Sequence, residues 1–329
     1  MYMPKQLVFA PTAQCNLQCA HCRVDRSRGN GADMLTAAAA VAFIERCQAH
    51  EIDRVGFSGG EPFLEPDFLE AVCRASVDGG LYFDRLMTNG VWFVDAAELN
   101  SILQRVYDAG FDGTIAISVD AWHNPDAERL LQFVQAVRRI WGRSDCLEVV
   151  SVLNRDGSCD SSYLEGLAGG LGARIRYEAD MPMAIYDSSY EDNKRAGMED
   201  GSGLYIPVLT MPYSAAADDP AAWQAQRWFK DDWCEGPGNI FYVHPDGKVA
   251  VCCGFANENP QLIIGTVEDS WETLMANAEA NRHVQDCFSK GLATKRQEME
   301  AAGTKYPGKT GDICFFCDWL CRQELAGKE

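Results

Sequence analysis

The first part of the chain alternates between two kinds of segment, and this alternation restricts the fold more than any other feature. Short apolar segments rich in Val, Ile, Leu and Phe are typical of strands that are covered on both faces. Between them lie longer segments with the apolar spacing of amphipathic helices, several of which end at a glycine. The expected strands are residues 6–10, 54–57, 83–87, 114–119, 147–153 and 174–178, and the expected helices are residues 36–49, 66–78, 95–109, 125–141 and 161–171.

Strands that alternate with helices form βαβ units, and such units build a parallel sheet. The six expected strands are fewer than the eight of a closed (β/α)8 barrel. The sequence therefore predicts an α/β fold, a partial (β/α)6 barrel of parallel strands that is open on one side. We expect this barrel in residues 1–185.

Beyond residue 185 the alternation ends, and two further parts are predicted. Residues 186–232 are polar and acidic, but they contain Trp223, Trp228 and Phe229, so we expect a bridging segment packed on the barrel. Residues 233–329 contain two apolar runs on either side of His-Pro-Asp-Gly at 244–247. This pattern indicates a hairpin, because proline presets a turn and glycine tolerates a positive φ. We expect a small domain built on this hairpin and a helix.

Charge and cysteine content exclude several classes of protein. A formal net charge of −19 argues against nucleic acid as a partner, because its phosphates would be repelled. No run approaches the ~20 apolar residues of a membrane span, and no signal peptide is recognisable. We therefore expect a soluble cytoplasmic protein without a membrane partner. Thiols stay reduced there, so clustered members of the 14 cysteines are expected to bind metal.

Three cysteines follow the first expected strand in the spacing C-x3-C-x2-C: Cys15, Cys19 and Cys22. Three thiolates on one tight loop suit a [4Fe–4S] cluster in which one iron has no protein ligand. That open iron can be chelated by a substrate or a cofactor. A zinc site with His21 as the fourth ligand is the alternative, although structural zinc usually binds paired C-x2-C knuckles.

This motif, on the loop after the first strand of a partial barrel, resembles that of the radical S-adenosylmethionine (SAM) superfamily, with His21 at the family's aromatic position. The resemblance implies that SAM chelates the open iron through its amino and carboxylate groups. Electron transfer into the sulfonium then gives methionine and a deoxyadenosyl radical, which abstracts a substrate hydrogen. It also implies a flavodoxin- or ferredoxin-type electron donor.

A second match lies at the end of the second expected strand, where Ser58-Gly59-Gly60-Glu61-Pro62 contains the family's G-G-E-P motif. Glycines let the backbone approach a ligand, and a carboxylate is expected to meet the ammonium group of SAM. On its own, such a turn is also compatible with a simple connection between a strand and a helix. Its position on the strand that follows the cysteine motif favours the functional interpretation.

Further matches lie at carboxyl ends of strands, where parallel sheets hold their ligands. Thr88-Asn89-Gly90 ends the third strand. Family members contact the SAM ribose at the position of Ser118 and the methionine moiety near that of Asn154. Each residue taken singly is equally typical of a cap or a turn. The resemblance extends over about residues 6–180 and implies these SAM-binding residues: His21, Ser58, Gly59, Gly60, Glu61, Ser118 and Asn154.

The tail contains a second group of cysteines, drawn from the hairpin and from a distant C-x2-C pair. Four such thiolates suit either zinc or a second [4Fe–4S] cluster. The pattern resembles the auxiliary-cluster extensions called SPASM and twitch domains, although a full SPASM domain has seven cysteines and two clusters. The resemblance implies one auxiliary [4Fe–4S] cluster, with the ligands Cys234, Cys252, Cys314 and Cys317.

Two other cysteines are alternative ligands of this auxiliary cluster, and five more are not expected to bind it. Cys321 is an alternative for one of the four ligands, and Cys253 is an alternative for Cys252. The remaining cysteines are expected to be buried apolar filler: Cys47, Cys73, Cys146, Cys159 and Cys287.

Cys253 bears on the reaction, because side chains alternate in an extended segment and its thiol then points away from the ligand Cys252. A free thiol near the cavity can donate a hydrogen atom to a carbon radical. This is the chemistry of the ribosomal-peptide epimerases, which the chain resembles in size and in its single auxiliary cluster. We therefore predict a peptide-modifying enzyme of the oxidoreductase or isomerase type, with epimerisation and Cys253 as donor its most specific form. Alternatively, Cys253 is a spare thiol or a ligand.

Two other functions remain open. One is a twitch-type dehydrogenase of a small alcohol or amino sugar, in which the auxiliary cluster accepts the second electron. The other is a non-enzymatic iron–sulfur or zinc scaffold, which would make the G-G-E-P motif accidental. Asp120, Trp122 and His123 are expected to line the substrate mouth, with His123 either a general base or a hydrogen-bonded loop histidine. The net negative charge of the chain suits a basic peptide as substrate.

Overall fold

The computed structural model describes residues 3–28, 34–143, 145–195, 203–213, 219–229, 239–252 and 254–326. The chain divides into two compact units, and each contains segments that are distant in the sequence. Unit 1 comprises Met1–Ala13, Arg23–Val55 and Ser214–Glu329. Unit 2 comprises Gln14–Cys22 and Gly56–Tyr213. The cysteine loop and both strand-end motifs that follow it therefore belong to unit 2.

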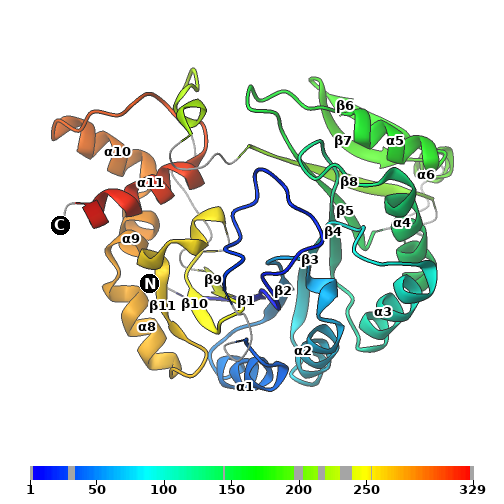
Figure 1. The fold of residues 1–329 in the computed structure, drawn as a ribbon, viewed down its shortest axis with the longest axis horizontal. Coiled ribbons are helices and arrows are strands. Elements are labelled where there is room, and N and C mark those ends of the chain that lie inside the picture. Colours follow the sequence, from blue (N-terminus) through cyan, green and yellow to red (C-terminus); the bar gives the residue numbers. More distant parts are fainter. Residues whose placement is uncertain are drawn as a thin grey trace. The chain divides into compact units, whose positions relative to one another are not determined.

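Unit 2 is built on a sheet with the strand order β2-β3-β4-β5-β8-β7-β6 (Figure 1). Strands β3, β4, β5 and β8 are parallel to one another, whereas β7 and β6 are antiparallel to their neighbours. The central strands β4 and β5 are largely buried, and the predicted α/β class is confirmed. The strands are β2 (Arg54–Phe57, divided between the two units), β3 (Tyr82–Thr88), β4 (Thr114–Ser118), β5 (Leu147–Val152), β6 (Arg174–Glu178), β7 (Met181–Tyr186) and β8 (Tyr205–Met211).

Helices connect the parallel strands of unit 2, as expected for βαβ units. Asp95 and Asp126 accept backbone hydrogen bonds at the first turns of α3 and α4, as residues at the start of a helix commonly do. Each of the helices predicted in this part of the chain is present, with ends within two residues of the prediction. The helices are η2 (Pro62–Leu64), α2 (Pro66–Asp78), α3 (Ala96–Asp108), α4 (Ala127–Trp141), α5 (Ser162–Gly170) and α6 (Ser188–Arg195).

The sixth predicted strand has a different direction from the one expected. Residues 174–178 do form strand β6, but it pairs antiparallel with β7 through a tight turn. Ala179 and Asp180 both have positive φ in this turn, which is the geometry of a two-residue hairpin. Asn-Gly or Asp-Gly normally indicates such a turn, so Ala-Asp gave no signal. The strand parallel to β5 is β8, which lies within the segment that was expected to bridge the barrel and the tail.

Unit 1 joins the first strand of the chain to the hairpin of the tail. β1 is parallel to β9, β9 and β10 form the predicted hairpin, and β11 pairs antiparallel with β10. Gly247 has φ +74° in the hairpin turn, a conformation that favours glycine. The strands are β1 (Gln6–Phe9), β9 (Ile240–Val243), β10 (Lys248–Ala250) and β11 (Ile263–Thr266).

Most helices of unit 1 lie in the tail, and a cluster of aromatic rings packs between them and residues 219–229. Trp223 lies 5.3 Å from Phe315 and 5.4 Å from Trp319 between ring centroids.

None of the helices among the described residues combines the length and apolar character that crossing a membrane requires. The helices are α1 (Ala37–Gln48), η3 (Pro220–Trp223), η4 (Phe255–Glu258), η5 (Pro260–Leu262), α8 (Trp271–Ala280), α9 (Arg282–Gln285), the π-helical turn η6 (Asp286–Lys290), α10 (Leu292–Ala301) and α11 (Ile313–Ala326).

The close approach of β3 and β4 gives a test of the fold of unit 2. A Cβ at Gly113 would overlap the carbonyl oxygen of Asp84 and the side chain of Phe83. We expect Gly113→Ala to lower the free energy of unfolding by about 1–3 kcal/mol in urea titrations, because the backbone has to shift. Gly166→Ala in α5 is the control, since no atom lies within 4 Å of its Cβ position, and alanine should be neutral or stabilise the helix by up to about 1 kcal/mol. Equal effects of the two substitutions would contradict this packing.

Candidate active site around the cysteine loop

Three loops of unit 2 are joined by hydrogen bonds: residues 14–22, 58–62 and 88–91. The backbone N–H of Glu61 donates to the carbonyl of Gln14 at 2.8 Å. The side chain of Asn16 donates to the carbonyl of Val91 at 3.0 Å and accepts from Asn89 Nδ2 at 2.8 Å. The cysteine loop is thus fastened to both strand-end motifs. Asn16 was not among the predicted site residues, and a polar residue within the cysteine motif was its only sequence signal.

Glu61 is the central residue of this arrangement, with its side chain 1% exposed. One carboxylate oxygen accepts hydrogen bonds from Thr88 Oγ1 at 2.8 Å and from the N–H of Phe63 at 3.3 Å. The other accepts from the N–H of Asn89 at 2.8 Å. Burial raises the pKa of Glu61 to about 7, against the lowering effect of these three donors. Both oxygens are engaged within the protein, and pairing with the SAM ammonium stays a prediction.

The three cysteines of the loop differ in exposure, since Cys15 and Cys19 are half-buried and Cys22 is exposed. The sulfur of Cys15 accepts from the N–H of Leu17 at 3.4 Å and from Asn89 Nδ2 at 3.6 Å. The N–H of Cys22 donates to the carbonyl of Cys19 at 3.1 Å, which forms a turn. Donors directed at sulfur stabilise thiolates and tune iron–sulfur clusters. The loop therefore fits a cluster, although no three metal-binding side chains in the described ranges already form a closed group.

His21 lies within the same loop and packs against the segment that follows β4. Its ring centroid is 4.7 Å from that of His123 and 6.2 Å from that of Trp122. Its Nδ1 is buried and has no hydrogen-bond partner among the described residues. Burial, followed by the positive charge of His123, lowers the pKa of His21 to about 4. The neutral imidazole is therefore the form present at physiological pH.

His123, whose ring packs against that of His21, forms a close pair with Asp120. One oxygen of Asp120 lies 2.8 Å from His123 Nδ1 and accepts from the backbone N–H groups of Trp122 and His123, both at 2.9 Å. The other oxygen accepts from the N–H of Val152 at 3.0 Å. Burial opposes ionisation of Asp120, but the hydrogen bonds and the charge of His123 hold the pKa of Asp120 below its ordinary value. Asp120 thus orients the imidazole of His123.

The other predicted SAM contacts have mainly local roles in the described structure. Ser118 is buried at the end of β4. Asn154 closes a turn, because its N–H and its Nδ2 donate to the carbonyl and the hydroxyl of Ser158 at 2.8 and 3.0 Å. Gly59 has φ +110°, and it lies half-buried beside half-buried Ser58 and Gly60.

The second group of cysteines lies in unit 1. The sulfurs of Cys314 and Cys252 lie 3.2 and 3.7 Å from the position that a Cβ on Gly254 would occupy. Glycine at this position leaves room for both sulfurs. Cys317 is buried on α11, within hydrogen-bond distance of Cys321. Two predicted residues, the ligand Cys234 and the hydrogen-atom donor Cys253, lie outside the described residues.

Of the five cysteines predicted to be buried filler, four are buried, and the prediction is wrong for Cys159, which is half-buried. Cys47, Cys73 and Cys146 are buried, and burial raises the pKa of each thiol, to about 12 for Cys47 and about 11 for Cys146. They are therefore neutral and suit a core role. Cys287 differs, because its sulfur lies 4.0 Å from that of Cys317.

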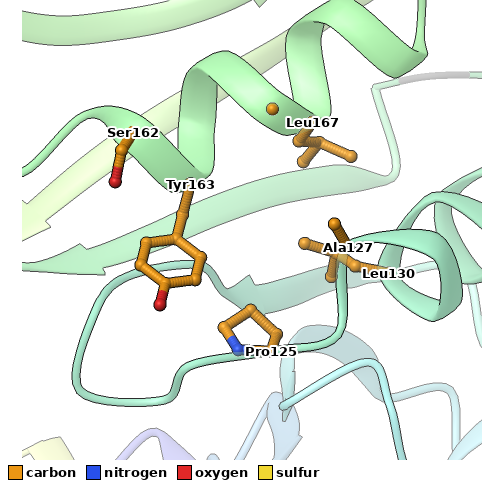
Figure 2. A pocket seen from close by; sticks show the side chains of 7 residues that line it. Pro125, Ala127, Leu130, Ser162, Tyr163 and Leu167 are labelled. Atoms are coloured by element: carbon orange, nitrogen blue, oxygen red, sulfur yellow. The ribbon is translucent and has the colours of Figure 1, made fainter.

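A pocket of about 150 Å³ lies between the start of α4 and the start of α5 (Figure 2). Its walls are mainly apolar, with the hydroxyl groups of Ser162 and Tyr163 at one side. It is lined by Pro125, Ala127, Leu130, Ser162, Tyr163, Gly166 and Leu167. None of the predicted SAM or metal residues lines this pocket, so it is distinct from the candidate site around Glu61 and the cysteine loop.

The titration of Glu61 gives a test of its role between the loops. Its pKa of about 7 in the folded chain exceeds the ordinary value of 4.5. The folded state therefore binds this proton more tightly, and the resulting stabilisation is complete below pH 4.5 and is lost as the pH rises through about 7. We expect the unfolding free energy of the wild type to fall relative to that of Glu61→Gln over this range. Glu45→Gln, which removes an exposed carboxylate on α1, is the control for the loss of a charge. A difference that stays constant with pH for Glu61→Gln would contradict the raised pKa of Glu61.

Comparison with known proteins relates this site to a family. Residues 9–157 match the family model of the radical SAM superfamily. The AdoMet-dependent heme synthase of Methanosarcina barkeri is 32% identical over 117 residues, which are 36% of this chain and 31% of that protein. The chain spans less than a third of the length of the curated relatives that it matches.

Two solved structures share the fold over nearly the whole chain. SuiB of Streptococcus suis has a TM-score of 0.53 at 13% identity, covering 95% of this chain and 77% of that one. The protein anSMEcpe, with bound AdoMet and Cp18Cys peptide, has a TM-score of 0.52 at 14% identity, covering 98% of each chain. At such low sequence identity, these similarities concern the fold alone. They confirm the predicted α/β partial barrel. Residues 9–157, which contain the cysteine loop and the strand-end motifs described above, are therefore similar to the radical SAM superfamily.

Proposed function

We propose that the chain is a radical SAM enzyme, which cleaves SAM reductively and abstracts a hydrogen atom from its substrate. The observation that carries this proposal is the fastening of the cysteine loop to the G-G-E-P loop and to the Thr88-Asn89 loop. A chain that used its three cysteines only for structural zinc would not need these two motifs at one site. The match of residues 9–157 to the superfamily supports the same function.

Each part of the site has a separate task in this proposal. Cys15, Cys19 and Cys22 hold three irons of a [4Fe–4S] cluster, and the donors of Leu17 and Asn89 stabilise the Cys15 thiolate. When bound, the cluster and SAM supply methionine and a deoxyadenosyl radical. Gly59 and Gly60 let the backbone approach SAM, while Glu61 keeps the loops in register. His21, Ser58, Ser118 and Asn154 complete the proposed SAM-binding set.

An auxiliary [4Fe–4S] cluster in the tail is part of the proposal. The sulfurs of Cys252 and Cys314 already lie beside Gly254, and Cys317 follows Cys314 by one turn of α11. Cys234 is proposed as the fourth ligand on its sequence spacing. Thiolates on a hairpin and on a distant helix suit a cluster that also ties these two segments together.

Iron analysis tests both clusters. Anaerobic reconstitution of the wild type should give about eight irons per chain, and Cys15→Ala/Cys19→Ala/Cys22→Ala should retain about four. The triple variant should form no deoxyadenosine from SAM. Cys73→Ala serves as the control, since this buried cysteine belongs to neither cluster, and it should keep all the iron. SAM cleavage by the triple variant would contradict the first site, and about four irons plus zinc in the wild type would remove the auxiliary cluster.

The most specific form of the proposal is epimerisation of a residue in a ribosomally made peptide. The radical abstracts Hα from the substrate residue, and Cys253 returns a hydrogen atom to the other face. The thiyl radical left on Cys253 then needs one electron and one proton, and a flavodoxin- or ferredoxin-type donor supplies the electron. The fold shared with anSMEcpe, which was solved with a peptide, and the net charge of −19, which attracts basic peptides, support a peptide substrate.

Substitution of Cys253 tests this step. Cys253→Ala should leave the cleavage of SAM unchanged and abolish formation of the D-residue, because the substrate radical loses its hydrogen donor. Cys146→Ala, a buried cysteine in unit 2, is the matched control. In D2O the wild type should leave one deuterium at the epimerised carbon, since a thiol exchanges with solvent. Normal product formation by Cys253→Ala would exclude the epimerase mechanism.

The Asp120–His123 pair favours a second candidate, a dehydrogenase of a small alcohol or amino sugar. Such an oxidation removes a hydrogen atom from carbon, a proton from oxygen and one further electron, which an iron–sulfur acceptor takes. An imidazole oriented by a buried carboxylate suits the acceptance of that proton. The same D2O experiment separates the two functions, because an oxidised product contains no deuterium at the reacting carbon.

A further inference from the structure

Cys287 lies in unit 1 on the π-helical turn η6, between helices α9 and α10 (Figure 1). Its side chain is 2% exposed, and its sulfur is 4.0 Å from the sulfur of Cys317 on α11. No disulfide bond joins these two cysteines, since their separation is about twice the length of such a bond. Two thiols from different helical segments therefore meet in the interior of the tail.

Cys317 belongs to a row of three cysteines on α11. Cys314, Cys317 and Cys321 are separated by three and four residues, so they lie on the same face of the helix. The Cys317 thiol lies near Cys321, about one helical turn further along α11, as well as near Cys287. Cys314 lies beside Gly254, which the Cys252 sulfur also approaches. Cys287 thus adds a sulfur to the same face of α11 on which the proposed auxiliary ligands lie.

The backbone around Cys287 is built in an uncommon way that fixes the position of this thiol. The N–H of Gly291 donates to the carbonyl of Asp286 at 2.9 Å, which closes the π-helical turn, and Gly291 has φ +83°. Asp286 also forms a 2.5 Å ion pair with Lys295 of α10, and both side chains are less than 10% exposed. Turns of this kind are rare and are frequently found at functional sites. Two independent features therefore single out Cys287: its contact with Cys317 and the turn that presents it.

Two buried cysteines outside the tail, Cys47 and Cys73, show neither feature in the described structure. Cys47 lies in α1 and Cys73 in α2, both regular helices. The contacts described for these two residues include no second cysteine. Cys47 and Cys73 therefore fit a role as apolar filler, and Cys287 differs from both.

We infer that Cys287 supplies a thiolate to the auxiliary iron–sulfur site, an assignment that rests on the cluster of the proposed function. Ligation removes the thiol proton and forms one sulfur–iron bond, and no electron is transferred in this step. Soft thiolates are the ligands that iron–sulfur clusters require. The tail then has more cysteines than one cluster needs, and Cys287 replaces one of the four that the sequence pattern implied.

The experiment uses the full-length Cys15→Ala/Cys19→Ala/Cys22→Ala chain, so that iron reports only on the auxiliary site. After anaerobic reconstitution with iron and sulfide, this background should hold about four irons and give an electron paramagnetic resonance signal on reduction. Adding Cys287→Ala should reduce the iron to fewer than about one per chain or leave a cluster with an altered signal. Adding Cys73→Ala, the matched buried cysteine, should change neither value.

Each result of this experiment has a separate meaning. Four irons and an unchanged signal in the Cys287→Ala chain would overturn the inference and leave the auxiliary cluster intact. A disulfide between Cys287 and Cys317 with full iron content would overturn it as well. A background that binds no iron would show that the auxiliary cluster itself is wrong, and the inference would fall with it.

A second measurement separates ligation from packing. Cys287→Ser keeps the size of the side chain, and its circular dichroism spectrum should match that of the background while its iron is lost. In the reconstituted wild type, iodoacetamide in mild urea should label Cys287 only after iron is removed by a chelator. Cys73 should be labelled to the same extent with and without iron. Equal labelling of Cys287 in both states would overturn the inference even if both variants misfold.

Discussion

The buried carboxylate of Glu61 is the interaction on which the geometry of the candidate site depends. A carboxyl group in a protein interior is costly unless donors surround it, and here three donors come from two different loops. Its own N–H is bonded to the start of the cysteine loop. A single residue therefore links the motif that would carry iron to the two motifs that would carry SAM, and each loop is held by contacts that the others supply.

Much of the fold was predictable because it depends on local patterns. Apolar runs and glycines at helix ends gave the strands and helices with small errors at their ends. The direction of β6 was not predictable, because it depends on a turn in which Ala179 and Asp180 adopt positive φ without a glycine. β8 was missed for a related reason, since only Ile206 and Val208 are buried in a strand whose other face is partly exposed.

For the site, spacing identified the residue types, and the structure added their contacts. The motifs indicated that Glu61 and the cysteines belong together, but no spacing rule shows that Asn16 and Asn89 bond to each other across more than seventy residues. The relation between Cys287 and Cys317 is of the same kind. It depends on how a π-helical turn packs against α11, and a sequence pattern read along the chain contains no information on such a contact.

The pairing of β1 with β9 has a consequence for how the protein is made. The first strand of the chain finds its parallel neighbour more than two hundred residues later, with Gln6 opposite Ile240. During synthesis, β1 leaves the ribosome long before that partner exists, so one of its edges stays open while unit 2 is completed. Open edges of this kind invite pairing with other chains, and contacts between distant residues form slowly. Completion of unit 1 therefore waits for the last third of the polypeptide.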